Sequence, residues 1–594
     1  MTIHPMPRAV PDPSGEQSDP EPPQEPQVGF RFGDVFDSLP EDTRTPTGYR
    51  VTSAGVALRR AVSKTEDSWI RFAFAPLVMT ATFEDPDGEQ YVEISWTDRT
   101  KGPSRKVSRL VSRETAKRGR ELVRRLGGAG LPVVEGDSRL VERWLAEFEA
   151  ANRGRIPSEP LAHWLGWQPD GSFVASPEDG IKVDVIYDEL REVANAHGRH
   201  GTLEGWRETV GGLEGFPVPR VAIAASLAAS LLNPLRINSF TFDISSRSTK
   251  GKTTALQCAL SVWANPSEQS DAMSNWRTTL YAIEKRLNLV RGIVTIFDET
   301  MAVTDESIID EVLYQLPMNH GKARSGGAFG SMLPWETILL SSGERPALSF
   351  TTSQGAAARI LGTTIPPFGD NGGAAAVRAR EGVLANFGHA GPAFVEYVRE
   401  ILAKPDGREV LKSRHRHLAE HFRGDNDMTG RRSPMVAVLA LAEALACEAG
   451  LLPYKPLPEG QWRRLFAAHN QTDNRPEMAM DVVREYIAGH AWELWPRNSD
   501  DDRPPVRGWL GAVKQAGDET KVAILPERLR GILTDAGYSL DAVVGGWIDA
   551  GYLELRPSQR PAHLIPIRFD GGRAKCFSFT PKALQVDDGV QEAA

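Results

Sequence analysis

The spacing of apolar positions changes along the chain, and each change marks a different kind of element. From residue 48 to about 98, short apolar runs alternate with polar positions and are separated by turn residues such as those at 85–88, which is typical of β-strands. Helical spacing follows at about 113–125 and 138–152. These patterns predict a first folded domain of α+β type at 46–195.

A different order begins near residue 202, where helical patterns alternate with apolar strands. Such alternation predicts an α/β layer with a mostly parallel sheet, which we place at 196–405. Residues 406–500 have mainly helical spacing, and 501–594 show two helical patterns followed by strands, the order of a winged-helix module. The predicted fold class is therefore α/β, with an α+β domain before the core and helical and winged-helix-like domains after it.

The N-terminal segment and the most apolar segment of the chain bear on where in the cell the protein is expected. Residues 1–45 are rich in Pro, Glu, Asp and Ser, and we expect them to be disordered because they cannot bury enough apolar surface. The first 30 residues contain eight prolines and no apolar core of a signal peptide. The apolar run at 221–235 is too short for a membrane span, so it predicts a buried helix. We expect a cytoplasmic protein without a membrane partner.

Composition narrows the class of partner. The net charge of −9 excludes a general polyanion binder, so any nucleic-acid contact must use local cations. One such group is the run 101–125, in which ten of 25 residues are Lys or Arg. It fits either a path for a phosphate backbone or a solvated helix face. The three cysteines are far apart in the sequence, and this spacing argues against a zinc site and against a disulfide framework.

The strongest chemical signal is a strand, a loop and a helix at 237–263. The loop predicts phosphate binding through backbone N–H groups and a helix N-terminus. Gly251 permits close backbone approach, Lys252 reaches the β- and γ-phosphates of ATP, and Thr253 places a hydroxyl on Mg²⁺. The usual first glycine of this motif is replaced by a serine. The predicted nucleotide-binding residues are Ser246, Arg247, Ser248, Thr249, Lys250, Gly251, Lys252, Thr253 and Thr254.

A second signal lies 46 residues after Lys252, where the apolar run 289–300 ends in two acidic residues. Acidic groups at the carboxyl end of a buried strand lie where α/β sheets bind ligands. We expect Asp298 to hold Mg²⁺, directly or through water, and Glu299 to act as general base on the attacking water. The next strand, at 336–344, ends near Ser342, which we expect to contact the γ-phosphate or that water.

These motifs occur together in a known family. The segments GTLEGWRETV (201–210), SSRSTKGKTTALQCALSVWANP (245–266), SNWRTT (274–279), FDE (297–299), NHGKAR (319–324), WETILLSSGE (335–344) and GAAARI (355–360) resemble the domain of unknown function 927 family. That family resembles the AAA+ helicases of mobile elements, including minichromosome-maintenance-like replicative helicases. The resemblance covers about 46–450 and is strongest at 200–362.

The resemblance implies further roles. Arg359 corresponds to the arginine finger that acts on ATP of the neighbouring subunit, which implies a ring, and a hexamer is expected. Arg345 is the alternative finger, and Arg431 or Arg432 would be a second sensor. Related motors carry a pore hairpin before the sensor strand, which implies that Lys322 and Arg324 contact single-stranded or forked DNA, with Phe329 as a stacking face.

The first interpretation is thus a ring-forming AAA+ ATPase that translocates on and unwinds DNA for a mobile element or phage, with a primase or another replication protein as a possible partner. The second is an ATP-driven switch or protein remodeller, for instance in phage defence. Two others stay open: a phosphotransferase acting on a small molecule, for which no acceptor pocket is marked, and a structural nucleotide site, which would not require Glu299. DNA-stimulated ATP hydrolysis separates the first two.

Overall fold

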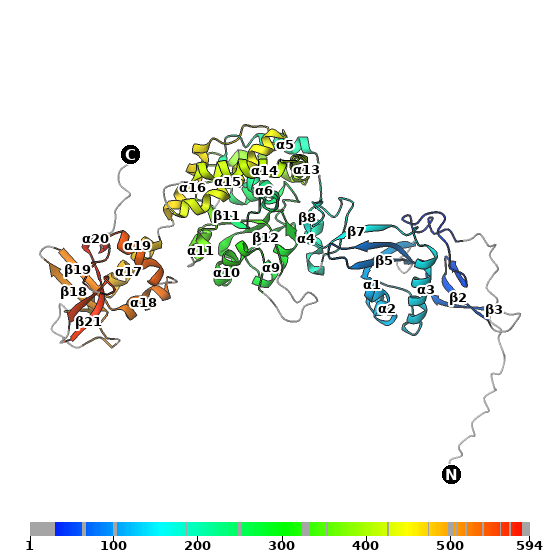
Figure 1. Cartoon of the computed structure of the whole chain (residues 1–594), viewed down its shortest axis with the longest axis horizontal. Helices are drawn as coiled ribbons and strands as arrows, with labels where there is room; N and C mark the ends of the chain where they lie inside the picture. Colours follow the sequence, from blue (N-terminus) through cyan, green and yellow to red (C-terminus); the bar gives the residue numbers. More distant parts are fainter. Residues whose placement is uncertain are drawn as a thin grey trace, which may run out of the picture. The chain divides into compact units, whose positions relative to one another are not determined.

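The computed structural model (Figure 1) describes most of the chain. Its internal contacts divide the chain into two units, with the boundary in the sequence between Glu159 and Pro160. The described residues are 30–61, 67–98, 104–185, 187–246, 251–322, 333–351, 354–423, 427–472, 475–496, 504–506, 508–516, 519–536, 538, 540–558, 560–569 and 572–584. Each unit is considered by itself below.

The first unit combines antiparallel strands with helices. Its elements are β1 (Tyr49–Thr52), β2 (Gly55–Ala61), β3 (Asp67–Ala73), β4 (Leu77–Glu84), β5 (Gln90–Asp98), β6 (Arg105–Ser112), α1 (Arg113–Ala116), α2 (Gly119–Gly127) and α3 (Ser138–Ala151). Strands β1, β2 and β3 form one antiparallel sheet, and β4, β5 and β6 pair in order as another. The helix predicted at 113–125 is thus two shorter helices. The fully buried Trp144 fixes α3 to β4, because its indole N–H donates to the carbonyl of Leu77 at 2.7 Å.

The expectation of disorder at 1–45 is wrong for its last part. Phe32, Phe36 and Leu39 are buried in the core of the first unit. The side chain of the fully buried Asn152 bonds both the backbone N–H and the carbonyl of Arg44, at 2.7 and 2.9 Å. A few aromatic residues in a polar segment were sufficient to anchor it, and composition averaged over 45 residues concealed them. Residues 1–29 lie outside the described part of the chain.

The centre of the second unit is a sheet of five parallel strands in the order β12-β14-β15-β11-β16. The strands are β11 (Phe240–Ser245), β12 (Met273–Asn275), β14 (Thr295–Asp298), β15 (Ile338–Gly343) and β16 (Ile360–Thr363). The first strand along the chain, β11, is therefore flanked by the last two. An α/β fold is confirmed, and because the strands are parallel their carboxyl ends meet along one edge of the sheet.

Helices cover this sheet on both faces. The helices of this part of the chain are α4 (Arg191–Asn195), α5 (Leu203–Gly211), α6 (Pro217–Ala228), α7 (Leu232–Leu235), α8 (Lys252–Leu260), α9 (Leu280–Asn288), α10 (Ser307–Gln315), α11 (Gln354–Ala357), α12 (Gly373–Ala385), α13 (Ala390–Leu402), α14 (Gly407–Phe422), α15 (Asp427–Glu448) and α16 (Glu459–Thr472). One face contributes Ile244 and Leu340 to a core with α6, α8 and α15. The other contributes Phe297 and Leu339 to a core with α9 and α10.

The apolar segment of the sequence belongs to this core. Pro217–Leu235 has the length and composition to cross a membrane, yet 94% of it is buried inside the protein, as expected for a core helix. A buried ion pair joins it to the helices that follow the sheet: Arg220 donates to Glu443 at 2.8 Å, and both side chains are almost completely inaccessible. The Arg220 guanidinium also stacks on Tyr454, 3.9 Å from the ring centroid.

Two expectations for this region differ from the structure: the end of the first domain and the strand at 289–300. The first domain was expected to reach residue 195, but Trp167 and Val174 belong to the core of the second unit. These residues lie on or beside β8 (Leu165–Trp167) and β9 (Phe173–Val174), which form a small sheet with β13 (Val290–Arg291). The apolar run 289–300 is therefore two strands, β13 and β14, separated by Gly292 at φ 91°.

The C-terminal segment has its own core. It contains α17 (Arg475–Gly489), β17 (Leu494–Trp495), β18 (Gly511–Ala516), β19 (Glu519–Ile524), α18 (Pro526–Asp535), α19 (Leu540–Asp549), β20 (Leu564–Phe569), β21 (Gly572–Phe579) and α20 (Pro581–Leu584). The side chains of Ala479, Met480 and Val483 on α17 pack in this core, so the boundary expected at 500 falls inside it.

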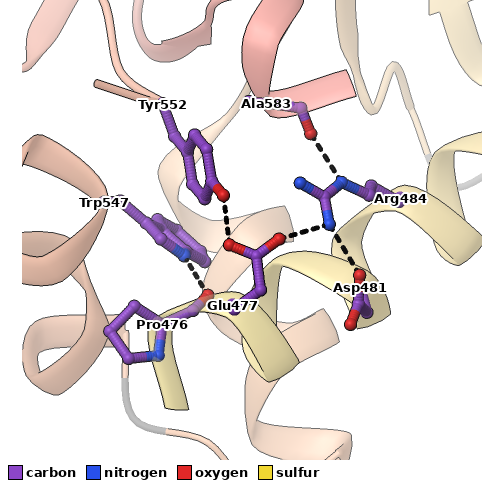
Figure 2. A network of polar contacts seen from close by, with 7 residues as sticks. All are labelled: Pro476, Glu477, Asp481, Arg484, Trp547, Tyr552 and Ala583. Atoms are coloured by element: carbon purple, nitrogen blue, oxygen red, sulfur yellow. Dashed lines mark hydrogen bonds and ion pairs between the residues drawn. The ribbon is translucent and has the colours of Figure 1, made fainter. Parts of the chain in front are cut away.

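Polar contacts fix α17 to the rest of this segment (Figure 2). Glu477 accepts hydrogen bonds from Tyr552 and from Arg484, the latter at 2.6 Å. Arg484 also donates to the carbonyl of Ala583 at 2.7 Å, and the indole of Trp547 donates to that of Pro476 at 2.6 Å. Burial alone would raise the pKa of Glu477, but these hydrogen bonds outweigh it and lower the pKa.

Candidate nucleotide site

The phosphate loop expected from the sequence lies between β11 and α8. Residues 247–250, with Arg247, Ser248, Thr249 and Lys250, lie outside the described part of the chain. Gly251 precedes the helix at φ 82°, a left-handed conformation that favours glycine. A Cβ at this position would lie 2.5 Å from the ring of Phe368, so glycine is required both for the backbone angle and for the space.

Ser246 and Lys252, which lie on either side of the undescribed part of the loop, are both buried. The Lys252 ammonium donates to the backbone carbonyl of Ser246 at 2.6 Å. The hydroxyl of Ser246 is buried and has no hydrogen-bond partner among the described residues. A buried polar group of this kind is costly unless something bonds to it, so the loop has spare hydrogen-bonding capacity beside a cation. This fits a phosphate.

The first residues of α8 bring further polar groups to the same place. Thr253 follows Lys252 in the first turn, and its Oγ1 donates to Asp298 Oδ2 at 2.9 Å. Ser342, near the end of β15, donates its hydroxyl to the other oxygen of Asp298. Three segments far apart in sequence thus converge at the carboxyl ends of β11, β14 and β15. Thr254, the last residue of the predicted loop, is partly buried in the same turn.

The convergence of Thr253 and Asp298 fits a magnesium ion. Mg²⁺ in nucleotide sites is held by one or two protein oxygens together with phosphates and water. Among the described residues no group of three or more His, Cys, Asp or Glu forms a self-sufficient metal site. A threonine hydroxyl and a carboxylate oxygen 2.9 Å apart match the donor set that Mg²⁺ would need from the protein if a nucleotide supplied the remaining ligands.

Glu299 adopts an uncommon conformation directly after β14. Its φ of 57° and ψ of 83° lie in the left-handed region, which is unusual for a residue with a Cβ. Its carboxylate accepts the backbone N–H of Met301 at 3.2 Å, and its own N–H donates to Asp298 at 2.9 Å. Backbone strain of this kind occurs often at functional sites, where the surrounding structure holds it in place.

Asp243 is a site residue that the motif-based prediction missed. It lies in the middle of β11, fully buried, and accepts hydrogen bonds from Ser245 and from the backbone N–H of Ala347, the latter at 2.9 Å. Burial raises the pKa of Asp243 to about 6, although these hydrogen bonds and nearby Lys252 favour the ionised form. An aspartate within the apolar strand FTFDIS was the signal that could have revealed it.

The arginines implied by the family resemblance lie in different environments. Arg359 is exposed directly before β16, and its carbonyl accepts the N–H of Thr241 at 3.2 Å. Arg345 pairs with Glu306 at 2.9 Å and stacks on Phe350. Of the two sensor candidates, Arg431 is exposed, whereas Arg432 is buried and donates to the carbonyl of Ala357 at 2.9 Å.

Only the base of the expected pore hairpin is described. Gly321 donates its N–H to Leu333 at 2.9 Å, and Trp335 donates to Asn319 at 3.0 Å, an antiparallel pairing of the two ends. Lys322 is exposed and pairs with Glu311 on α10. Arg324 and Phe329 lie outside the described residues.

Comparison with known proteins supports the resemblance. Residues 49–328 match the family described as "Domain of unknown function (DUF927)", which confirms over this part of the chain the resemblance expected from the motifs. The solved structure "SCCmec type IV Cch - active helicase" is similar with a TM-score of 0.65 and 18% identity, over 90% of this chain and 98% of that chain. At this identity the likeness shows a shared fold.

A second solved structure, "The A form apo structure of NrS-1 C terminal region", aligns with 66% of this chain and 92% of that chain. Its identity is 9% and its TM-score 0.22, which is too low to support an argument. None of the curated proteins matches the chain.

Proposed function

We propose that this chain, which carries a DUF927 domain, is a Mg²⁺-dependent ATPase of the AAA+ type that forms a ring and moves on or unwinds DNA. The observation that carries the proposal is the convergence of Thr253 and Ser342 on Asp298, beside the N-terminus of α8. This is the arrangement required for binding a triphosphate with its metal ion at the carboxyl edge of a parallel sheet.

Each residue has a distinct role in this proposal. Lys252 would exchange its bond with the Ser246 carbonyl for phosphate oxygens, and Thr253 and Asp298 would hold Mg²⁺, which would supply positive charge to the phosphates. Glu299 takes a proton from the attacking water. Ser342, which donates to Asp298, would orient that carboxylate and contact the γ-phosphate or the attacking water.

The position of Arg359 supports an arrangement in which neighbouring subunits share a site. Strands β11 and β16 are parallel, and Arg359 bonds to Thr241 near the start of β11, whereas the phosphate loop follows the end of β11 at Ser245. Four residues of strand span about 13 Å, at roughly 3.3 Å per residue. An arginine that distant from the loop of its own subunit is better placed to act on ATP held by another.

A cavity beside α12 is our candidate for the site of the nucleotide base. A cavity of about 300 Å³ lies between α5 and α12, lined by residues that include Thr209, Leu213, Ala375 and Ala379. Helix α12 begins shortly after Phe368, the residue that packs against Gly251. We assign this cavity to the base. The C-terminal segment, in which α18 and α19 precede the β20–β21 hairpin, would be a winged-helix-like module.

The proposal is tested by ATP hydrolysis with and without single-stranded DNA. Glu299→Gln should lower the rate by about 100-fold or more, the usual effect of removing a general base, while Glu268→Gln, an exposed control, should leave it unchanged. If DNA stimulates hydrolysis and Glu299→Gln abolishes it, the motor is supported. Hydrolysis that is indifferent to DNA would instead favour the ATP-driven switch, and a fully active Glu299→Gln would refute the assigned base.

Sharing of sites between subunits is tested by mixing two inactive variants. Lys252→Ala removes nucleotide binding but keeps the arginine, and Arg359→Ala does the reverse. Mixed rings contain interfaces in which Lys252 of one subunit meets Arg359 of its neighbour, so mixing should restore hydrolysis. If this mixture stays inactive, and a mixture of Lys252→Ala with Arg345→Ala recovers hydrolysis, then Arg345 is the arginine finger and Arg359 is not.

A further inference from the structure

One face of the β1–β3 sheet in the first unit carries cations around a tryptophan. The register places Arg50 opposite Ala57 and Ala57 opposite Arg71, while Arg59 lies opposite Trp69. Residues two apart on a strand point to the same side of a sheet. Arg50, Arg59, Trp69 and Arg71 therefore share one face, which we call the Arg-Trp face. Labels β2 and β3 mark these strands in Figure 1.

The opposite face of the same sheet is its core side. Tyr49 and Val51 are buried in the core of the first unit, and Leu58 packs against that core. The sheet is thus apolar on one side near β1 and basic on the other, while Arg60 and Ile70 on the core side lie beyond the core and are exposed. Side chains on the basic side do not contribute to the core, so an aromatic residue there is available to contact a ligand.

Trp69 is that residue. It is 37% exposed, whereas Trp96 and Trp144 of the same unit are fully buried. The Arg50 guanidinium lies over its ring at 4.4 Å from the centroid, and the side chains of Arg50, Arg59 and Arg71 are exposed. One face of the indole is covered by a cation. One acidic residue, Asp67 at the start of β3, lies opposite Ala61 on the same face, beside three arginines.

We infer that the Arg-Trp face binds single-stranded nucleic acid, with a base stacked on Trp69 and phosphates paired with Arg71 and Arg50. Aromatic rings flanked by cations form the usual platform for unpaired strands, because every base has a π-face and every nucleotide carries a phosphate. A duplex offers no free base for such stacking.

This inference deepens the proposed function by adding a nucleic-acid contact outside the ATPase core. Binding at the Arg-Trp face requires no ATP hydrolysis, so its failure and the failure of the motor are seen in different measurements. A chain that binds DNA through Trp69 but hydrolyses ATP indifferently to DNA would retain this inference and lose the motor.

The experiment measures binding of a fluorescent oligothymidylate to the full chain without nucleotide. Trp69→Ala should weaken binding by about five- to a hundredfold, the range for loss of one stacked base. Arg71→Ala should lower affinity and reduce the slope of log K against log salt concentration by about 0.7, the value for one phosphate contact on a single strand. Trp69→Phe should retain most of the affinity, since a smaller ring still stacks.

The alternation of the strand supplies matched controls. Ile70 and Arg60 are exposed neighbours that point to the opposite face, so Ile70→Ala and Arg60→Ala should bind as the wild type does. All variants are also measured in a Lys322→Ala background, which removes a contact expected in the core. The inference is overturned if Trp69→Ala stays within about twofold of the wild type in both backgrounds.

Two other outcomes overturn it as well. Equal losses in Arg71→Ala and Arg60→Ala, with none in Trp69→Ala, would show diffuse charge attraction without stacking. Equal weakening by Trp69→Ala of binding to the oligothymidylate and to an acidic polypeptide such as polyglutamate would indicate an acidic protein partner.

Discussion

The buried carboxyl of Asp243 leads to a quantitative prediction about stability. Because burial raises its pKa from 3.8 to about 6, the folded protein binds this proton more tightly than the unfolded chain does. A raised pKa contributes stability that is fully present below the unfolded value and is lost as the pH rises through the folded value. Wild-type protein should therefore gain stability from this group on acidification from pH 8 to pH 5.

The size of the effect follows from proton linkage. With pKa values of 3.8 unfolded and about 6 folded, the gain between pH 8 and pH 5 is about 1.4 kcal/mol. Asp243→Asn has nearly the same volume, and its amide oxygen can still accept the N–H of Ala347, but it does not titrate. The free energy of unfolding of wild type minus that of Asp243→Asn should thus increase by this amount on acidification.

Differential scanning calorimetry of both proteins at the two pH values measures this difference. The transition of the second unit should shift in favour of the wild type by about 1.5–2 °C between pH 8 and pH 5, because a unit of this size has an unfolding entropy of roughly 2.1 cal/mol/K per residue. Asp305→Asn is the control, because this exposed carboxyl has a pKa lowered by Ser307 and should show no such gain. A difference that is independent of pH, or that reverses, would refute the raised pKa.

Three further substitutions have expected outcomes. Glu443→Gln leaves the buried Arg220 without its carboxylate partner. It should lower the free energy of unfolding of the second unit by about 3 kcal/mol or more, measured by calorimetry. Gly251→Ala forces a Cβ to 2.5 Å from Phe368 and should abolish binding of a fluorescent ATP analogue, whereas Gly373→Ala, with open space around it, should bind normally. Glu477→Gln should destabilise only the C-terminal segment by about 1–2 kcal/mol at pH 7, and the loss should shrink as the pH falls, because the pKa of this carboxyl is lowered.

The parts of the site that the sequence predicted are those with short-range signals. A strand, a glycine-containing loop and a helix follow one another within 27 residues, and two acidic residues end an apolar run. In a parallel sheet the carboxyl ends of neighbouring strands lie side by side. The contact between Asp298 and Ser342 therefore follows from their positions at the ends of two such strands. The roles assigned to these residues stay predictions until hydrolysis is measured.

The features of the fold and the site that the sequence did not reveal depend on contacts between segments that are distant in the sequence. Phe32 and Phe36 are inconspicuous in a polar N-terminal region, and only the core that receives them shows why they are ordered. Gly292 breaks an apolar run that periodicity alone joins into one strand. Asp243 bonds to Ala347, 104 residues away, and no local pattern connects the two.

The geometry of Arg359 also bears on the type of assembly. Its position beside the start of β11 and the phosphate loop after the end of that strand are different surfaces of one subunit, about 13 Å apart by strand length. If Arg359 completes the site of a neighbour, one surface of each subunit contacts the other surface of the next, a heterologous contact. Such contacts generate closed rings or open helical filaments, whereas a two-fold dimer uses one surface twice. Restored hydrolysis in the mixed variants would therefore predict rings or filaments rather than isolated dimers, and the particle size in solution under the same conditions would distinguish the two.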